Sequence, residues 1–310
     1  MSSSQSVLVV GGDELGTAVI TYLLTHPQRE STSIRLAMLW RAETLNSADP
    51  STQSELARLT SQGVTFEAGD VDTSPISDLA ATFGKYDVVI QCAGYGRPPS
   101  MQRRVTQAVL EAGSVRRYFP WQFGVDYEAI GAGGSSHALF DELLEIRKML
   151  RSSQGKTEWT VVSTGLFMSF LFLPDFGVVN MEEKVVRALG SWDNKVTVTT
   201  PEDIGRMVAE MVYVPEGTAN RVVYIGGDTV SYGHLAEILE GVYGEKFRRE
   251  VWDTDYLKKR LQEEPDNMML KYQNTFAAGV GVSWDRAETL NGQRGIDLTG
   301  VEQYVRQEKK

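Results

Sequence analysis

The opening segment of the chain constrains its fold most strongly. Residues 7–10 (V-L-V-V) are typical of a strand buried on both faces, and they run through glycines directly into an apolar helix. Three glycines there allow a tight turn and close packing of helix on strand. The free N–H groups and the dipole of the helix N-terminus favour an anion such as a pyrophosphate. The segment therefore predicts a dinucleotide-binding turn, which comprises Gly11, Gly12, Asp13, Glu14, Leu15 and Gly16.

This turn departs from the G-x-G-x-x-G fingerprint at one position. Asp13 stands where the second glycine of the fingerprint lets backbone approach phosphate. A carboxylate there repels a pyrophosphate unless it turns away, and Asp is also a favourable helix N-cap. Two interpretations stay open from the sequence. The turn binds a dinucleotide, or it merely links strand to helix with Asp13 as the cap.

Composition excludes several classes of function. The 310 residues can form one extended domain or two closely joined ones, and a net charge of −10 argues against a nucleic-acid surface. No stretch approaches the roughly 20 apolar residues of a membrane span. Cys92 is the single cysteine, so no intramolecular disulfide forms, and we expect a small buried thiol and a reducing, cytoplasmic location. The three histidines are far apart in sequence, so no metal site is expected.

Strand and helix patterns alternate after the opening turn. Strands are predicted at 34–40, 64–68, 86–91, 117–120 and 159–163. This alternation predicts an α/β chain with a Rossmann-type, doubly wound parallel sheet. Ligands of such sheets lie beyond the carboxyl ends of the strands. At that edge we expect the glycine turn, Arg41, Cys92, Ala93, Gly94, Trp121, Gln122 and Phe123.

Arg41 follows the second predicted strand, where dinucleotide folds meet the adenosine ribose. An acid at this place binds the ribose 2′-hydroxyl of NAD, whereas an arginine accepts the 2′-phosphate of NADP. No Asp or Glu lies between Ser31 and Arg41, and the planar fork of Arg suits a phosphate. Glu43 lies close enough in sequence to serve NAD instead. We favour NADP(H).

Several motifs resemble one family. Residues 117–126 (R-Y-F-P-W-Q-F-G-V-D), 164–167 (T-G-L-F) and 196–206 (V-T-V-T-T-P-E-D-I-G-R) are similar to the NmrA-like and isoflavone-reductase-like branch of the extended short-chain dehydrogenases, especially its fungal natural-product members. The resemblance implies an NADP-binding Rossmann domain at 1–163 and a smaller α/β substrate-binding part at 164–310. It also implies that Gly165 and Phe167 turn back over the cofactor.

The predicted helix 137–151 bears on the chemistry. Reductases of this family carry a Phe-x-x-Lys motif on the corresponding helix, and aligning Phe140 with its Phe places Leu143 at the lysine. A leucine transfers no proton. Gln122, at a glutamate position of the family, Asp126, after the Phe-Gly segment, and His137, at the predicted helix start, are the candidate catalytic residues.

Three functions remain open from the sequence. The first is an NADP(H)-dependent oxidoreductase that transfers hydride to an apolar, cyclic small molecule, with part of the apolar run 167–173 lining the pocket, in fungal secondary metabolism. The second keeps the bound cofactor but catalyses cyclisation. The third is a non-catalytic dinucleotide sensor of the NmrA type that binds a protein. The sequence predicts no nucleic-acid or membrane partner and leaves the oligomeric state open.

Overall fold

The computed structural model describes residues 5–94, 96–97, 99–134, 137–153 and 155–309. The chain forms two compact units that are interleaved in sequence. The first unit comprises residues 1–122, 145–161 and 204–222, and the second comprises 123–144, 162–203 and 223–310. The predicted division into a cofactor part ending at 163 and a substrate part starting at 164 concerns function and stays a prediction.

A seven-stranded sheet forms the centre of the first unit. The last two residues of β6 and of β11 are assigned to the second unit. The strand order is β11-β6-β5-β4-β1-β2-β3, and β1 to β6 pair in parallel. This confirms the Rossmann-type sheet, in which β1 lies between β4 and β2 and its residues 7–10 are fully buried. The strands are β1 Gln5–Val10, β2 Ile34–Trp40, β3 Thr65–Ala68, β4 Val88–Gln91, β5 Arg117–Phe119, β6 Glu158–Ser163 and β11 Arg221–Tyr224.

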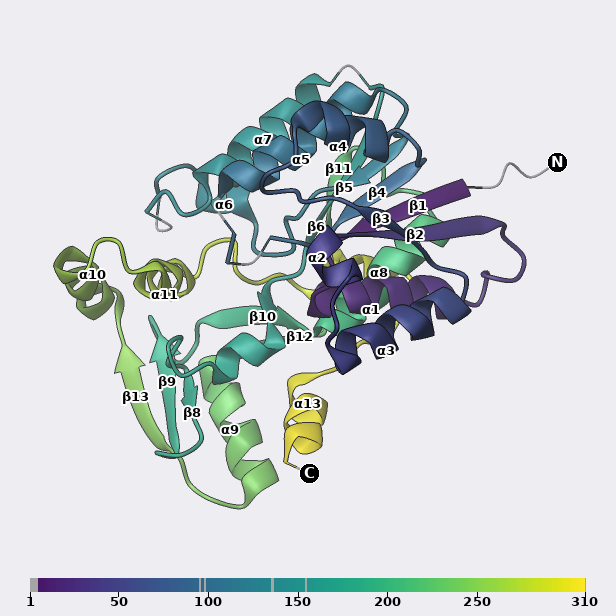
Figure 1. Ribbon diagram of the computed structural model, residues 1–310. Helices are drawn as coiled ribbons and strands as arrows, with labels where there is room; N and C mark the ends of the chain where they lie inside the picture. Colours follow the sequence, from purple (N-terminus) through teal and green to yellow (C-terminus); the bar gives the residue numbers. More distant parts are fainter. Residues whose placement is uncertain (1–4, 95, 98, 135–136, 154, 310) are drawn as a thin grey trace. The chain divides into compact units, whose positions relative to one another are not determined.

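Helices cover both faces of this sheet (Figure 1). One face carries α1 Glu14–Thr25, α3 Pro50–Ser61 and α8 Pro201–Tyr213, and the other carries α4 Ile76–Phe83, α5 Pro99–Ala112 and α7 Asp141–Ser152. The helices α1 and α8 are in close contact, because a Cβ on Gly205 would lie 2.6 Å from the Ala18 carbonyl carbon. The Tyr213 hydroxyl also donates to the Leu23 carbonyl at 2.8 Å. A short helix, α2 Ala42–Leu45, follows β2.

The helix α7 begins later than the sequence predicts. His137 and Ala138 have φ angles of +47° and +65°, which a right-handed helix does not accommodate. The helix therefore begins at Asp141, and His137 lies before it. Within the helix, Leu143, Ile146 and Leu150 are buried and form an apolar face.

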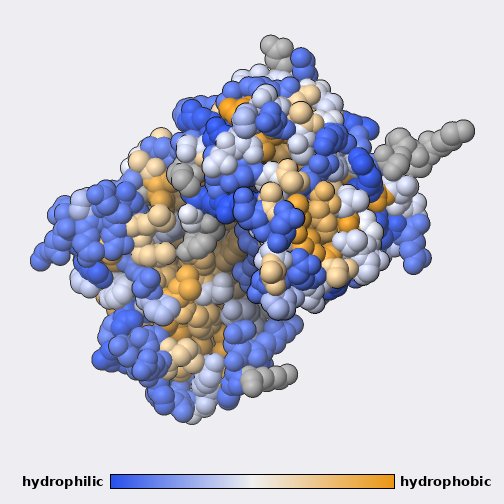
Figure 2. Space-filling model, viewed as in Figure 1, coloured by the Kyte–Doolittle hydropathy of each residue, from blue (hydrophilic) through white to orange (hydrophobic). Residues whose placement is uncertain are grey.

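The second unit is also α/β and holds two three-stranded sheets. One has the order β12-β10-β7 and the other β13-β9-β8. Helix α10 (Thr254–Glu263) bears charged residues and presents a hydrophilic surface in the space-filling view (Figure 2). The strands are β7 Leu166–Phe167, β8 Val179–Asn180, β9 Val185–Leu189, β10 Lys195–Thr199, β12 Asp228–Ser231 and β13 Arg248–Trp252. The helices are α6 Tyr127–Ile130, η1 Met168–Phe172, α9 Tyr232–Tyr243, α10 Thr254–Glu263, α11 Met268–Ala278, η2 Arg286–Glu288, α12 Leu290–Gln293 and α13 Val301–Glu308.

Candidate functional site

The glycine turn between β1 and α1 has no room for side chains. Gly11 has a φ of +108°, and a Cβ there would lie 2.8 Å from the Ala93 nitrogen. A Cβ on Gly16 would lie 2.1 Å from the Gly11 carbonyl oxygen. The amides of Cys92 and Ala93 donate to the Val10 carbonyl at 2.9 and 3.0 Å, which ties the ends of β1 and β4 together. The glycines therefore bring bare backbone to the carboxyl edge of the sheet.

Asp13 is the N-cap of α1. Its Oδ1 accepts a hydrogen bond from the Gly16 amide at 3.1 Å, so that oxygen is turned toward the helix backbone. Partial burial raises the pKa of Asp13, although the Gly16 N–H and the charge of Arg97 act in the opposite direction. Of the other two residues predicted in the turn, Glu14 is exposed, while Leu15 is buried and faces the core.

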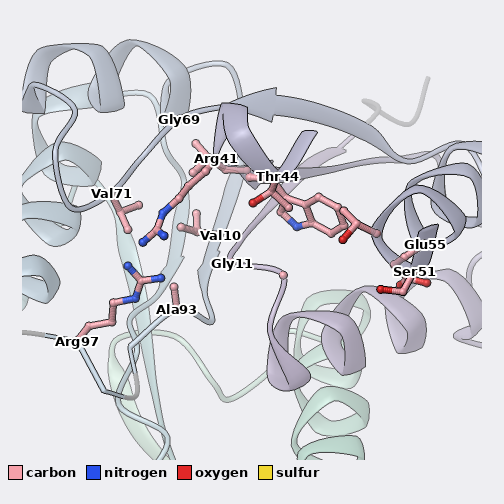
Figure 3. Close-up of a pocket in the computed structure, with 14 residues that line it drawn as sticks. Val10, Gly11, Arg41, Thr44, Ser51, Glu55, Gly69, Val71, Ala93 and Arg97 are labelled. Atoms are coloured by element: carbon pink, nitrogen blue, oxygen red, sulfur yellow. The ribbon is translucent and has the colours of Figure 1, made fainter. Parts of the chain in front are cut away.

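A pocket of about 360 Å³ opens beside this turn in the first unit. The guanidinium groups of Arg41 and Arg97 face each other at one end, whereas Ser51 and Glu55 lie at the other (Figure 3). The pocket therefore has a cationic end and a polar end. Its lining consists of Val10, Gly11, Gly12, Leu39, Trp40, Arg41, Thr44, Ser51, Thr52, Glu55, Gly69, Val71, Ala93 and Arg97.

Trp40 forms part of this pocket and is 7% exposed. A Cβ on Gly12 would lie 2.2 Å from the Trp40 Nε1, so the indole packs directly on the second glycine of the turn. Within the part of the chain that the structure describes, this indole N–H has no hydrogen-bond partner. A buried donor without a partner costs about 1–3 kcal/mol, which a ligand acceptor in the pocket would relieve.

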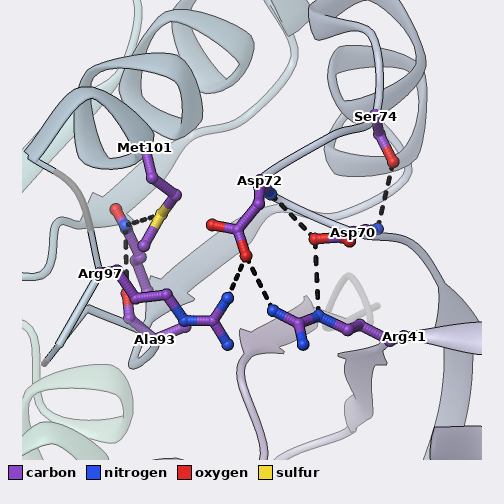
Figure 4. A network of polar contacts seen from close by, with 8 residues as sticks. Arg41, Asp70, Asp72, Ser74, Ala93, Arg97 and Met101 are labelled. Carbon is purple, nitrogen blue, oxygen red and sulfur yellow. Dashed lines mark hydrogen bonds and ion pairs between the residues drawn. The ribbon is translucent and has the colours of Figure 1, made fainter. Parts of the chain in front are cut away.

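Two aspartates hold the cationic end of the pocket (Figure 4). The Asp72 Oδ2 accepts from Arg41 Nη2 at 2.7 Å and also from Arg97, while Arg41 Nε lies 3.6 Å from Asp70 Oδ1. Partial burial acts to raise the pKa of Asp70, but the Asp72 amide, the Thr73 hydroxyl and both arginines together hold that pKa below its ordinary value. Asp70 is therefore ionised at neutral pH.

The roles of Asp72 and Arg97 were not found by sequence reasoning. Asp72 comes from the turn after β3, and Arg97 from the loop after β4. The signal that could have found Asp72 is the pair Asp70 and Asp72 shortly after the third strand. That strand ends at the same edge of the sheet as the strand before Arg41.

Gln122 is fully buried within the first unit. Its Oε1 accepts from the Nε of Arg147 at 2.8 Å, and Arg147, on α7, is fully buried as well. The oxygen of the Gln122 side-chain amide is therefore already engaged by a guanidinium. The sequence analysis did not identify Arg147 as a buried group. The signal that could have found it is the position of this charged residue directly after Ile146, which lies on the buried face of α7. A catalytic role for Gln122 stays a prediction.

The segment after β4 is tightly packed. Cys92 is 1% exposed, and burial together with the charge of Asp13 raises the pKa of its thiol. This confirms the expectation of a buried thiol. A Cβ on Gly94 would lie 2.1 Å from the Trp121 ring, so the indole covers this glycine. Ala93, Gly94 and Trp121 thus form one continuous packed surface at the edge of the sheet.

Three predicted cofactor contacts belong to the second unit. Gly165 has a φ of +75°, its Cβ would lie 2.0 Å from the Thr197 carbonyl oxygen, and its amide donates to the Gly124 carbonyl at 3.0 Å. Phe123 is buried and Phe167, in β7, is half-buried. The glycine is therefore required by the local backbone. The contacts of these residues with a cofactor stay a prediction.

The other two candidate catalytic residues have local structural surroundings. Asp126 is the N-cap of α6, where its Oδ1 accepts from the Glu128 and Ala129 amides, and its Oδ2 accepts from the Tyr224 hydroxyl at 2.7 Å. His137 is exposed. Catalytic roles for both stay predictions.

The described ranges contain no group of three or more His, Cys, Asp or Glu side chains arranged to hold a metal ion. Nor is any of their helices both long and apolar enough to cross a membrane.

Comparison with known proteins decides the family. The model of the NmrA-like family matches residues 3–304. The chain belongs to the NmrA-like family. It is 51% identical to an NmrA-like family domain-containing oxidoreductase of Gibberella moniliformis, and the match covers 98% of both chains.

Solved structures agree on the fold. A crystal structure of isoflavone reductase aligns with a TM-score of 0.79 at 20% identity, covering 99% of this chain and 100% of the other. The leucoanthocyanidin reductase–NADPH complex of Vitis vinifera aligns with a TM-score of 0.77 at 18% identity, covering 97% and 98%. The NmrA-like chain is therefore related to oxidoreductases and shares their Rossmann-type fold.

Proposed function

We propose that this chain is an NADP(H)-dependent oxidoreductase that transfers hydride between the nicotinamide and an apolar, cyclic small molecule. The observation that carries the proposal is the pocket in which a side-chain-free glycine turn adjoins two facing arginines. The known NADPH complex of a reductase with this fold supports the same cofactor. The 51% identical oxidoreductase of a fungus supports the redox class and a fungal metabolic setting.

The residues present fit a 2′-phosphorylated dinucleotide. Gly11 and Gly12 line the pocket with backbone alone, and the N-terminus of α1 offers a favourable dipole to a pyrophosphate. Arg41 would hold the 2′-phosphate, and the Trp40 indole N–H would find an acceptor in the bound ligand. When bound, the cofactor supplies the hydride. The chain orients it and excludes water from the reacting centre.

The substrate we propose needs no strong acid from the protein. Leu143 stands at the lysine of the resembling reductases and is 7% exposed, so it offers packing but no proton. Gln122 is engaged by Arg147, and Asp126 by the hydroxyl of Tyr224. We therefore favour a reactive, already electron-poor acceptor such as an iminium, which takes hydride without prior protonation.

Calorimetric titration of NADPH, NADP⁺, NADH and NAD⁺ tests the cofactor. We expect the two phosphorylated forms to bind more tightly, with NADPH at least equal to NADP⁺. Arg41→Ala should weaken both by about 10- to 100-fold, the equivalent of a lost charged hydrogen bond of about 1.5–3 kcal/mol, and leave NADH nearly unchanged. Arg116→Ala, which removes an arginine that is 70% exposed and pairs with Asp87, is the control. Equal losses for all four dinucleotides contradict the role of Arg41.

Deuterium-labelled NADPH tests the reaction. With a panel of cyclic iminium and related acceptors, we expect deuterium in the product and one NADPH oxidised per turnover. Turnover without NADPH consumption would mean cyclisation instead. Tighter binding of oxidised dinucleotides, with no turnover of any acceptor, would mean a sensor.

A further inference from the structure

We propose that Asp72 is a specificity-determining residue whose carboxylate competes with the ribose 2′-phosphate for Arg41 and Arg97. Asp72 thereby lowers the preference of the pocket for 2′-phosphorylated over unphosphorylated dinucleotides. The inference rests on the proposed NADP(H) site and adds to it a residue that weakens its selectivity.

The geometry makes Asp72 a stand-in for a phosphate oxygen. Its Oδ2 alone accepts from both guanidinium groups, so one anionic oxygen bridges two cations (Figure 4). Its Oδ1 is buried and has no hydrogen-bond partner among the residues that the structure describes. The carboxylate is thus held through a single oxygen. Both arginines line the pocket, and an incoming phosphate finds them already joined to Asp72.

Asp70 and Asp72 face the Nε and Nη2 atoms of Arg41. These two atoms form the edge of the guanidinium that suits bidentate binding of an anion. Its Nη2 donates to Asp72 and its Nε lies beside Asp70, and a phosphate bound in a fork would use such a neighbouring pair of N–H groups. Two arginines and two aspartates balance to a local charge near zero. A 2′-phosphate therefore enters a neutral network in place of a doubly positive one, and a nearby carboxylate disfavours it.

Two variants with opposite expected signs test this competition. The measured quantity is the ratio of the dissociation constants of 5′-AMP and adenosine 2′,5′-bisphosphate (2′,5′-ADP), which differ only in the 2′-phosphate. Asp72→Asn keeps the size of the side chain and an oxygen acceptor but removes the charge. We expect it to raise the ratio about tenfold, the effect of removing one like charge close to the ligand. Arg97→Gln leaves Asp72 to Arg41 alone and should lower the ratio.

Controls separate competition from general damage. Asp78→Asn removes an exposed carboxylate on α4 and should leave the ratio unchanged. The affinity of Asp72→Asn for 5′-AMP should stay within about twofold of the parent, because surface changes outside the contacts have small effects. Asp72→Ser carries the same expectation and replaces the Asn variant if the latter fails to fold.

The outcomes distinguish the two proposals. A parent protein that binds neither nucleotide overturns the proposed function and this inference with it. A parent that binds 2′,5′-ADP, together with an Asp72→Asn ratio that is unchanged or lower, overturns the inference alone. In that case Asp72 orients the arginines for the phosphate and does not compete with it.

Discussion

Arg41 and Arg147 carry the same side chain within the first unit but have opposite surroundings. The side chain of Arg41 is 42% exposed and pairs with Asp72 and Asp70. Arg147 is fully buried, and its Nε donates to the neutral amide of Gln122. Exposed ion pairs contribute about 0–1 kcal/mol, whereas leaving a buried polar group without its hydrogen-bond partner costs about 1–3 kcal/mol, and more when the group is charged.

This difference separates a binding group from a structural one. The partners of Arg41 lie on loops at a pocket, so a ligand can exchange with them at low cost. Arg147 has no access to solvent, and exchange of its partner would leave a buried donor unsatisfied. The degree of burial and the charge of the partner thus support the ligand-binding role that we propose for Arg41 and favour a structural role for Arg147.

The largest expected loss of stability comes from substitution of Arg147. Arg147→Met keeps much of the side-chain volume but leaves the Gln122 oxygen without this donor, and we expect the free energy of unfolding to fall by about 2–4 kcal/mol. The measurement is the urea unfolding midpoint. Lys148→Met is the matched control, because the neighbouring lysine is 69% exposed, and it should change stability by less than about 0.5 kcal/mol. Equal effects of the two substitutions would remove the contrast between buried and exposed cations.

Gly16→Ala tests whether the glycine turn beside the pocket also contributes to the stability of the folded protein. A Cβ there would lie 2.1 Å from the Gly11 oxygen, so the turn must shift, and we expect a loss of about 1–3 kcal/mol with weaker dinucleotide binding. Gly241→Ala in α9 is the control, because nothing lies within 4 Å of the added methyl group. It should instead stabilise by about 0.5–1 kcal/mol, since alanine is the better helix former. A neutral Gly16→Ala would mean that the turn relaxes freely.

Asp70→Asn should have the smallest effect, and that effect depends on pH. The pKa of Asp70 in the folded protein lies below its ordinary 3.8, so folding favours the ionised form. The stabilisation is complete above about pH 5 and is lost as the pH falls through 3.8 toward the folded-state pKa. We expect the variant to be less stable by at most about 1 kcal/mol at pH 7, as for an exposed ion pair.

Urea midpoints measured from pH 7 to pH 3 check this expectation. The difference between parent and Asp70→Asn should shrink as the pH falls. A difference that stays constant over that range would show that Asp70 acts through its hydrogen bonds and not through its charge.

The sequence predicts local structure well because local patterns determine it. The strands of the large sheet, the glycine turn between β1 and α1 and the place of Arg41 after β2 are confirmed. The predicted start of α7 at residue 137 was wrong, because hydrophobic periodicity does not reveal the positive φ angles of His137 and Ala138.

Contacts between distant segments were not predictable from those patterns. Arg41 and Asp72 are 31 residues apart, and Gln122 and Arg147 are 25 apart. Each pair meets only after the sheet and its helices have assembled. The alternating pattern predicts which edge they share, but the choice of partner depends on side-chain packing that no local pattern specifies.

The interleaving of the two units has a consequence for synthesis of the chain. The first unit needs α8 against α1 and β11 beside β6, and both arrive after the second unit has begun. When only residues 1–163 have emerged from the ribosome, the face of α1 that α8 later covers is therefore still exposed. We expect such a nascent chain to remain incompletely folded, so that the pocket beside the glycine turn forms only when more than two hundred residues have emerged.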